Sequence, residues 1–339
     1  MTVLDVLAEL TRQGGVAEHA GLVAAGSRRS LARVLATGQV VRDSRGRYAF
    51  PTADEGRRAA HRLHGVASHL SAAAHYGWAV KTRPDRPWVT VPRNRNVSAA
   101  DQKSVRVSWR RLGVGDVIDG WVTEPVRTVV DCAAALPFDE ALAVADSALR
   151  SGDLTAYELR RAADAHPARG RVRVLRVAQH ASALAANPFE SVLRAICLDV
   201  PGLCVAPQVE ITDETFYARV DLADIGLRIV VEADSFAFHG AREQLRHDCW
   251  RYDELVARGW LVLRFAWEQV MFAPSGCGPS SSRRSAVHAN GRWSPERPRY
   301  RVRTRPTPVA VLSALRCPRC RPRAWRGPRC PRAGPAGTS

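Results

Sequence analysis

The sequence lacks any apolar run long enough to cross a bilayer, which takes about 18 residues or more. Its first residues also lack the basic and apolar regions of a signal peptide. We therefore expect no membrane span, no membrane partner and a cytoplasmic location. The eight cysteines follow no regular spacing, which argues against a disulfide framework. Reduced thiols are expected at Cys132, Cys197, Cys204 and Cys249.

Acidic residues and lysine are nearly missing from the last fifth of the chain. Residues 273–339 contain 15 arginines, no lysine and a single acid, Glu296, so they carry +14 of the net charge of +17. They also hold 11 of the 21 prolines. Such a segment cannot bury enough apolar surface to offset its ordering entropy. We expect a disordered Arg/Pro-rich tail that binds nucleic acid through charge alone.

The remaining residues, 1–272, are nearly neutral and suited to folding. The length of 339 residues and the hydrophobic fraction of 46% predict two or three domains with packed cores. The fold class we expect is a multidomain combination of α/β and α+β units. The predicted units cover residues 1–52, 57–165 and 187–272.

Residues 1–52 are expected to form a winged helix-turn-helix. The apolar periodicity predicts three helices and then two strands, over residues 3–10, 16–25, 27–35, 40–42 and 47–50. Gly26 and Ser27 supply a turn and an N-cap before the third helix. Helices, a turn, a basic helix and a basic hairpin follow one another in the order of that fold.

Six arginines lie on the elements that a winged helix uses to bind DNA. They are Arg28, Arg29 and Arg33 in the predicted recognition helix, and Arg42, Arg45 and Arg47 on the hairpin. The recognition helix enters the major groove, and the wing lies near phosphate or the minor groove. The pattern therefore favours DNA as a partner, although a small helical domain with a solvated basic face would show the same residues.

Residues 57–165 are predicted to form an α+β unit. Helices are expected from Ser68, after Glu124 and over 138–149, with strands at 88–92 and 105–109. His69, His75 and Asp131 could be imagined as a site. No metal-ligand spacing or nucleophile joins them, so we interpret them as helix-cap and core-edge residues.

Short motifs in the first 165 residues resemble a known family. In the first unit they are Gly14-Gly-Val-Ala, Leu22-Val-Ala-Ala-Gly26, Gly38-Gln-Val-Val-Arg and Gly46-Arg-Tyr-Ala. In the second unit they are Ser68-His-Leu-Ser-Ala-Ala-Ala, Val89-Thr-Val-Pro and Glu124-Pro-Val-Arg-Thr-Val-Val-Asp. These segments look like the winged helix and following domain of AbiEi-type antitoxins of type IV toxin–antitoxin systems. The resemblance implies DNA binding at the protein's own promoter, and a cognate toxin as a partner.

The segment 187–272 carries the most informative pattern. Asn187, Pro188 and Glu190 form the start of a helix with a capping box. We then expect three strands, a helix at about 241–258, a buried strand at 260–265 and a helix at 267–271. The helix at 241–258 is predicted to turn four residues inward: Leu245, Cys249, Tyr252 and Val256. Asp221 and Glu232 fall where two adjacent strands end. This order, with acids on neighbouring strands, is the layout of PD-(D/E)XK nucleases.

The motifs of this segment closely resemble a family related to very-short-patch-repair (Vsr-like) endonucleases. They are Val220-Asp-Leu-Ala, Val231-Glu-Ala-Asp, His239-Gly, Arg246-His-Asp-Cys-Trp-Arg251 and Gly259-Trp-Leu-Val-Leu-Arg-Phe265. Phosphodiester hydrolysis in such enzymes uses Mg²⁺ held by carboxylates, which lowers the pKa of the attacking water. Asp221 and Glu232 would be the ligands for Mg²⁺ or Mn²⁺. Glu190 would orient a water or a second metal ion, and His239 is a candidate general base.

The pattern also departs from an active nuclease. Asp234 occupies the position of the motif lysine, and the chain's two lysines, Lys81 and Lys103, are far away in sequence. The candidates to replace that lysine are His239, Arg242, Arg246 and Arg251, but arginine cannot act as a base at neutral pH. Glu190 would also be explained by the capping box alone, and Arg251 by a helix salt bridge to Asp248.

Two functions follow from these patterns. The first is a DNA-binding protein with a metal-dependent endonuclease-like domain that cleaves DNA. The alternative is a non-enzymatic AbiEi-like antitoxin or transcriptional regulator with a degenerate nuclease domain.

Overall fold

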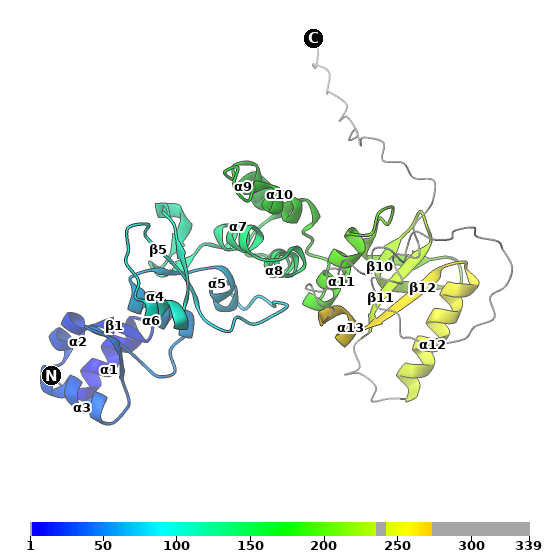
Figure 1. Cartoon of the computed structure of the whole chain (residues 1–339). Coiled ribbons are helices and arrows are strands. Elements are labelled where there is room, and N and C mark those ends of the chain that lie inside the picture. The colour runs from blue at the N-terminus through cyan, green and yellow to red at the C-terminus, as the bar shows by residue number, and fades with distance from the viewer. Residues whose placement is uncertain (1, 235–241, 273–339) are drawn as a thin grey trace, which may run out of the picture.

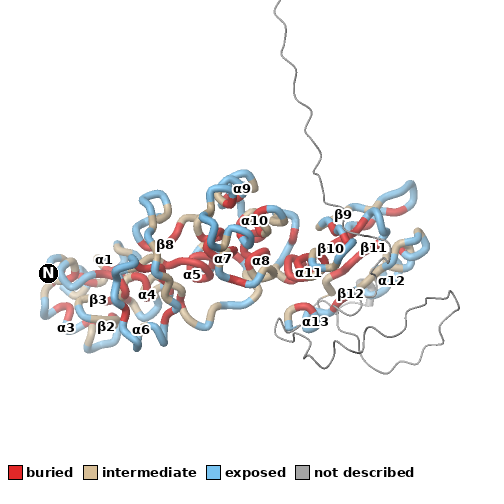
Figure 2. The backbone as a smooth tube through the Cα atoms, turned by 45° about the horizontal axis from the view of Figure 1, so that its top comes forward, coloured by how far each residue is buried: buried red, intermediate tan, exposed pale blue. Residues whose placement is uncertain are grey.

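The computed structural model describes residues 2–234 and 242–272, with the side chains of 242–244 excepted. Within these ranges the chain is a mixed α/β protein with thirteen α-helices and three β-sheets. The elements form three groups that follow one another in a row, each with its own buried core (Figures 1 and 2). None of the described helices combines the length and the apolar character that crossing a membrane requires. The predicted tail at 273–339 lies outside the described residues.

The N-terminal group packs three helices against a small sheet. Its elements are α1 (Val3–Arg12), β1 (Val16–Glu18), α2 (His19–Ala25), α3 (Arg28–Ala36), β2 (Val41–Ser44) and β3 (Arg47–Ala49). The antiparallel sheet has the order β1-β3-β2. Ser27 caps α3 by accepting a 3.0 Å hydrogen bond from the Ser30 N–H, as expected. The predicted helix at 16–25 is wrong in its first turn, because Val16–Glu18 pairs with β3 as a strand.

The middle group begins with an α+β layer. Its elements are α4 (Glu55–Leu63), β4 (Val66–Ala67), α5 (His69–His75), β5 (Trp88–Val91), α6 (Ala99–Ser104), β6 (Arg106–Trp109), the 3-10 turn Val114–Asp116, β7 (Val117–Ile118) and β8 (Val122–Thr123). The mixed sheet has the order β6-β5-β4-β8-β7. The two longer strands were predicted, whereas β4, β7 and β8 span only two residues each and show no alternation.

Four helices complete the middle group and connect it to the third. They are α7 (Pro125–Ala135), α8 (Phe138–Ser151), α9 (Ala156–Asp164) and α10 (Arg171–His180). Buried residues of all four share one core, which includes Val129, Val144, Leu159 and Val174. Helix α10 lies between the predicted units 57–165 and 187–272, and it packs with α7, α8 and α9.

The C-terminal group is a four-stranded sheet between helices. Its elements are α11 (Pro188–Leu198), β9 (Ala206–Thr212), β10 (Tyr217–Asp224), β11 (Ile229–Asp234), α12 (Arg242–Ala257), β12 (Leu261–Ala266) and α13 (Trp267–Met271). The order is β12-β11-β10-β9, with β11 and β12 parallel and the other pairs antiparallel. One face packs against α11 and α13, and Leu255 of α12 is buried in the cluster on the other face.

The predicted buried face of α12 is wrong at three positions. Leu245, Cys249 and Val256 are exposed, whereas Leu255 is fully buried. Tyr252 is the one predicted inward residue that packs against the sheet. Strand β12 is also less buried than expected, since it forms the edge of the sheet and Leu261 is exposed there.

Candidate functional site

Three carboxylates predicted from the sequence lie on adjoining elements of the C-terminal group. Glu190 is in the first turn of α11, capped by Asn187, whose side chain accepts a 3.1 Å hydrogen bond from the Glu190 N–H. The carboxylate of Glu190 is buried and accepts hydrogen bonds of 2.9 Å from the Ala186 N–H, the Asn187 side chain and Gln208. Burial and the negative charge of Asp221 both raise the pKa of Glu190. The capping role is therefore present, but Glu190 also lies in the electrostatic field of Asp221.

Asp221 and Glu232 face each other on neighbouring antiparallel strands. The prediction that each ends its strand is wrong, because β10 continues to Asp224 and β11 to Asp234, so both acids lie within their strands. The register pairs Leu222 of β10 with Val231 of β11, so the next positions along the ladder are Asp221 and Glu232. Asp221 accepts a 2.8 Å hydrogen bond from the Ala233 N–H. Burial, followed by the adjacent Asp221 carboxylate, raises the pKa of Glu232 to about 8. The hairpin thus brings the two carboxyl groups together, so that the charge of Asp221 opposes the ionisation of Glu232.

Gln208, a strand residue with a distorted backbone, lies between Glu190 and the pair of Asp221 and Glu232. The pairing of β10 with β9 matches Val220 to Val209 and Leu222 to Pro207, which puts Gln208 opposite Asp221. Gln208 has a φ of 52°, in the left-handed region that a non-glycine residue rarely adopts within a strand. Its side chain donates to Glu190. Gln208 was not predicted from the sequence, where its only signal is an amide within an expected strand.

Two arginines lie against the acids. Arg251 of α12 donates a 3.0 Å hydrogen bond to Glu232 and stacks on the Tyr252 ring, 4.7 Å from its centroid. Asp234, at the position where the predicted motif has its lysine, forms a 2.6 Å ion pair with Arg264 of β12. Arg251 therefore faces the carboxylate pair, in addition to its place one turn from Asp248 on α12.

The candidate general base, His239, lies outside the described residues. Among the residues that the structure describes, no group of three or more His, Cys, Asp or Glu side chains is arranged to hold a metal ion. The carboxylate oxygens of Asp221 and Glu232 are nevertheless of the donor type that Mg²⁺ and Mn²⁺ prefer.

The arginines predicted to contact DNA divide into two sets. Arg28, Arg29 and Arg33 of α3 are exposed, as are Arg42 of β2 and Arg45 at the tip of the hairpin. Within residues 2–234 and 242–272, the three arginines of α3 form no ion pair or side-chain hydrogen bond. Arg47 differs, because its side chain forms a 2.8 Å ion pair with Glu18 and contacts His64. Arg47 is thus turned toward the middle group rather than outward on the hairpin.

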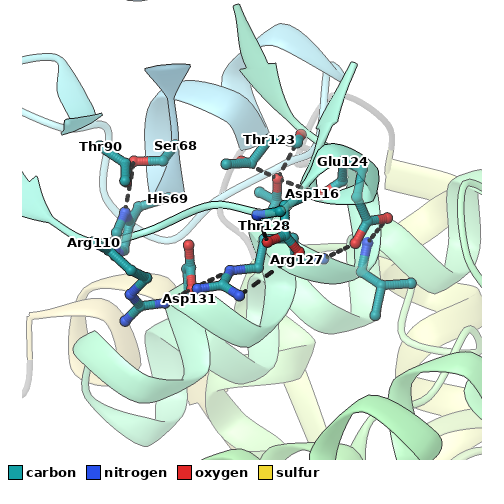
Figure 3. Close-up of polar contacts among 12 residues, drawn as sticks. Ser68, His69, Thr90, Arg110, Asp116, Thr123, Glu124, Arg127, Thr128 and Asp131 are labelled. Atoms are coloured by element: carbon teal, nitrogen blue, oxygen red, sulfur yellow. Dashed lines mark hydrogen bonds and ion pairs between the residues drawn. The ribbon is translucent and has the colours of Figure 1, made fainter. Parts of the chain in front are cut away.

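The middle-group residues that could be imagined as a site have structural roles. His69 is buried and contacts the Ser68 hydroxyl, and burial lowers its pKa to about 3 (Figure 3). Asp131 is fully buried between the guanidinium groups of Arg110 and Arg127 (Figure 3). His75 packs edge-on against the Trp121 ring. The structure therefore does not bring these three side chains together as one constellation.

The comparisons with known proteins leave the family open. No family model and no curated protein matches the chain. Among solved structures, the chain is similar to the RV2827C protein from Mycobacterium tuberculosis, with 16% sequence identity and a TM-score of 0.34. That match covers 56% of this chain and 79% of the other.

Proposed function

We propose that the chain is a DNA-binding protein whose C-terminal group is a metal-dependent, endonuclease-like domain. The observation that carries this proposal is the meeting of Asp221 and Glu232 on one hairpin, with Glu190 close enough to sense the charge of Asp221. Burying several carboxyl groups together is costly unless a cation or a proton compensates them. The raised pKa of Glu232 expresses that cost, and a divalent cation would relieve it.

The arrangement of the C-terminal strands supports the same proposal. A helix, three antiparallel strands, a crossover helix and a parallel fourth strand follow in the order expected for PD-(D/E)XK nucleases. The distorted backbone at Gln208 adds to this, because strain of this kind concentrates at functional sites. A bound Mg²⁺ or Mn²⁺ would polarise the scissile phosphate and lower the pKa of a water. Asp221 and Glu232 would hold it, and Glu190 would accept a hydrogen bond from a water beside it.

DNA binding is proposed for the N-terminal group. Its order α1-β1-α2-α3-β2-β3 is that of a winged helix, with α3 as the recognition helix. Arg29 and Arg33 lie one turn apart on the exposed side of α3, free to reach phosphates and bases. The exposed Arg42 and Arg45 on the hairpin extend this basic surface.

Plasmid nicking tests the nuclease proposal. Full-length protein with Mg²⁺ or Mn²⁺ is expected to nick supercoiled DNA, slowly because the motif lysine is absent. Asp221→Asn should abolish both nicking and metal binding, since it removes one negative ligand and little volume. Asp164→Asn, at the exposed end of α9, is the matched control and should behave as wild type. Wild-type protein that binds neither metal ion at millimolar concentration would overturn the proposal.

A non-enzymatic role is the second candidate, and the arginines favour it. Arg251 already occupies one side of Glu232, with which it forms an ion pair, and Asp234 is paired with Arg264 where a nuclease needs a lysine. A degenerate domain of this kind would grip DNA without cleaving it, as an antitoxin or a regulator of its own promoter would require. Metal binding without nicking, together with specific retention of promoter DNA in gel shifts, would favour this candidate over the first.

A further inference from the structure

A cavity of about 580 Å³ lies where the N-terminal group meets the middle group, far along the chain from the carboxylates. The N-terminal group contributes Gln13, Glu18 and Arg47, and the middle group contributes further residues from α4 and the segments around β5 and β8. Its volume falls within the range of small-molecule pockets, about 300–1,000 Å³. It is therefore large enough for one small organic molecule.

The wall of this cavity is rich in positive charge. Four arginines line it, Arg47, Arg57, Arg110 and Arg111, against two acids, Glu18 and Asp119. Arg47 is paired with Glu18, and Arg110 with the buried Asp131 outside the cavity. In the described part of the chain, neither Arg57 nor Arg111 forms an ion pair. The cavity thus keeps cationic groups that no carboxylate neutralises by direct contact.

The side chain of Arg57 is held in place, but part of its hydrogen-bonding capacity is unused. Its guanidinium donates a 2.8 Å hydrogen bond to the Gln13 carbonyl and stacks over the Trp121 ring, 4.6 Å from the centroid. Gly14, at a φ of +68°, lies against the guanidinium, where any β-carbon would overlap it. The buried Nε atom of Arg57 has no partner among the described residues. Burial lowers the pKa of Arg57, so the charge is held at a cost that a bound anion would offset.

His61 lines the same space and contains a second unpartnered nitrogen. Nδ1 of His61 is buried and makes no hydrogen bond to any described residue. Burial and the nearby Arg47 keep the pKa of His61 low, at about 4, so the ring is neutral. Val91, Pro92 and Leu112 also line the cavity and supply apolar surface.

We propose that this cavity binds a small organic phosphate, with the phosphate held by Arg57 and Arg111 and the organic part against the apolar surface. Planar guanidinium groups match phosphate oxygens in a bidentate geometry, which favours this anion. Because the N-terminal group and the middle group both line the cavity, the bound molecule would contact both of them. The site is separate from the exposed arginines of α3 and from the carboxylates, so it stands independently of the proposed nuclease activity.

Calorimetry on full-length protein tests the proposal with three probes: adenosine monophosphate, inorganic phosphate and adenosine. Adenosine monophosphate is expected to bind with one-to-one stoichiometry, inorganic phosphate more weakly, and adenosine not measurably. Arg111→Ala should weaken adenosine monophosphate binding about tenfold or more, since a charge-assisted hydrogen bond is removed. Arg111 is exposed and unpaired among the described residues, so its replacement should leave the fold intact.

Arg161→Ala is the matched control, because Arg161 is an exposed arginine of α9 away from the cavity. Both variants retain the arginine-rich tail, so non-specific association with the tail is the same in each. Equal affinity of wild type and Arg111→Ala for adenosine monophosphate would overturn the proposal, as would no binding at millimolar ligand. An Arg111→Ala effect on DNA affinity alone would also overturn it, and would assign the residue to a DNA-binding surface.

Discussion

Arg251 of α12 and Glu232 of β11 form an ion pair with 3.0 Å between Nη1 and Oε1, on the same hairpin edge that carries Asp221. Burial and Asp221 raise the pKa of Glu232, and Arg251 opposes that rise. One arginine therefore serves two carboxylates, and the pair is left with an excess of negative charge when both are ionised. The titration of Glu232 is the most direct report on this imbalance.

We expect stability to fall as the pH rises from about 4.5 to 8. The pKa of Glu232 is about 8 in the folded state against an ordinary 4.5, so the folded protein holds a proton that the unfolded chain releases in this window. The contribution is fully present below pH 4.5 and is lost as the pH passes the folded-state pKa. Glu232→Gln should flatten this part of the curve, because the amide cannot ionise. Urea denaturation at a series of pH values measures the effect.

Asp221→Asn should also change the dependence of stability on pH between about 4.5 and 8. Removing the neighbouring negative charge should lower the pKa of Glu232 and shift the loss of stability toward lower pH. An unchanged pH profile in both variants would show that Glu232 is not the group that titrates.

Metal affinity should increase with pH over the same range. A divalent cation must displace the proton on Glu232, so each pH unit below its folded-state pKa is expected to cost about tenfold in affinity. The affinity for Mn²⁺ should level off above pH 8, and isothermal titration from pH 6 to 9 would show this. An affinity independent of pH would place any bound metal elsewhere.

Duplex DNA binding should depend on the arginines of α3. Replacing Arg28, Arg29 and Arg33 with alanine is expected to weaken binding by several kcal/mol and to flatten its salt dependence, by about 0.9 in log–log slope for each phosphate that is no longer neutralised. The control replaces the exposed Arg161, Arg169 and Arg171 of the middle group, which changes the net charge equally. Gel shifts at several salt concentrations compare the two, and equal weakening would point to non-specific charge attraction.

Most of the helices and strands of the C-terminal group were predictable from patterns of residues that are close in sequence. The helix start at Asn187 depends on neighbouring residues, and the structure confirms it. The contact between Asp221 and Glu232 was also predictable, since a short turn fixes the register of a hairpin.

Features that depend on distant partners were not predictable. Strand β1 is three residues long and is defined by pairing with β3, some thirty residues later. The structural role of Gly14 also depends on a distant residue, because the glycine makes room for the side chain of Arg57. The burial of α12 was not predictable for a similar reason. Leu255 is buried and Val256 is exposed, because packing against the sheet, and not the apolar periodicity, decides which face of the helix is buried.

A buried ion pair that was not predicted from the sequence joins the middle and C-terminal groups. Arg194 of α11 donates to both carboxylate oxygens of Asp146 on α8, at 2.8 and 2.6 Å, and Asp146 is fully buried. Asp146 also accepts a 2.8 Å hydrogen bond from the Ser182 N–H. Burial raises the pKa of Asp146 despite the arginine, so the charged pair depends on both of its members.

Asp146→Ala should therefore destabilise the protein by about 3–5 kcal/mol, because it leaves the Arg194 charge buried without a partner. Replacing both residues, as Asp146→Leu with Arg194→Met, should recover most of that stability, since no uncompensated charge remains. Asp199→Ala breaks the exposed pair with Arg176 and is expected to cost about 0–1 kcal/mol. Urea denaturation followed by circular dichroism compares the three. If the pair couples the two groups, Asp146→Ala should also split a single transition into two, and a uniform shift of one transition would contradict that coupling.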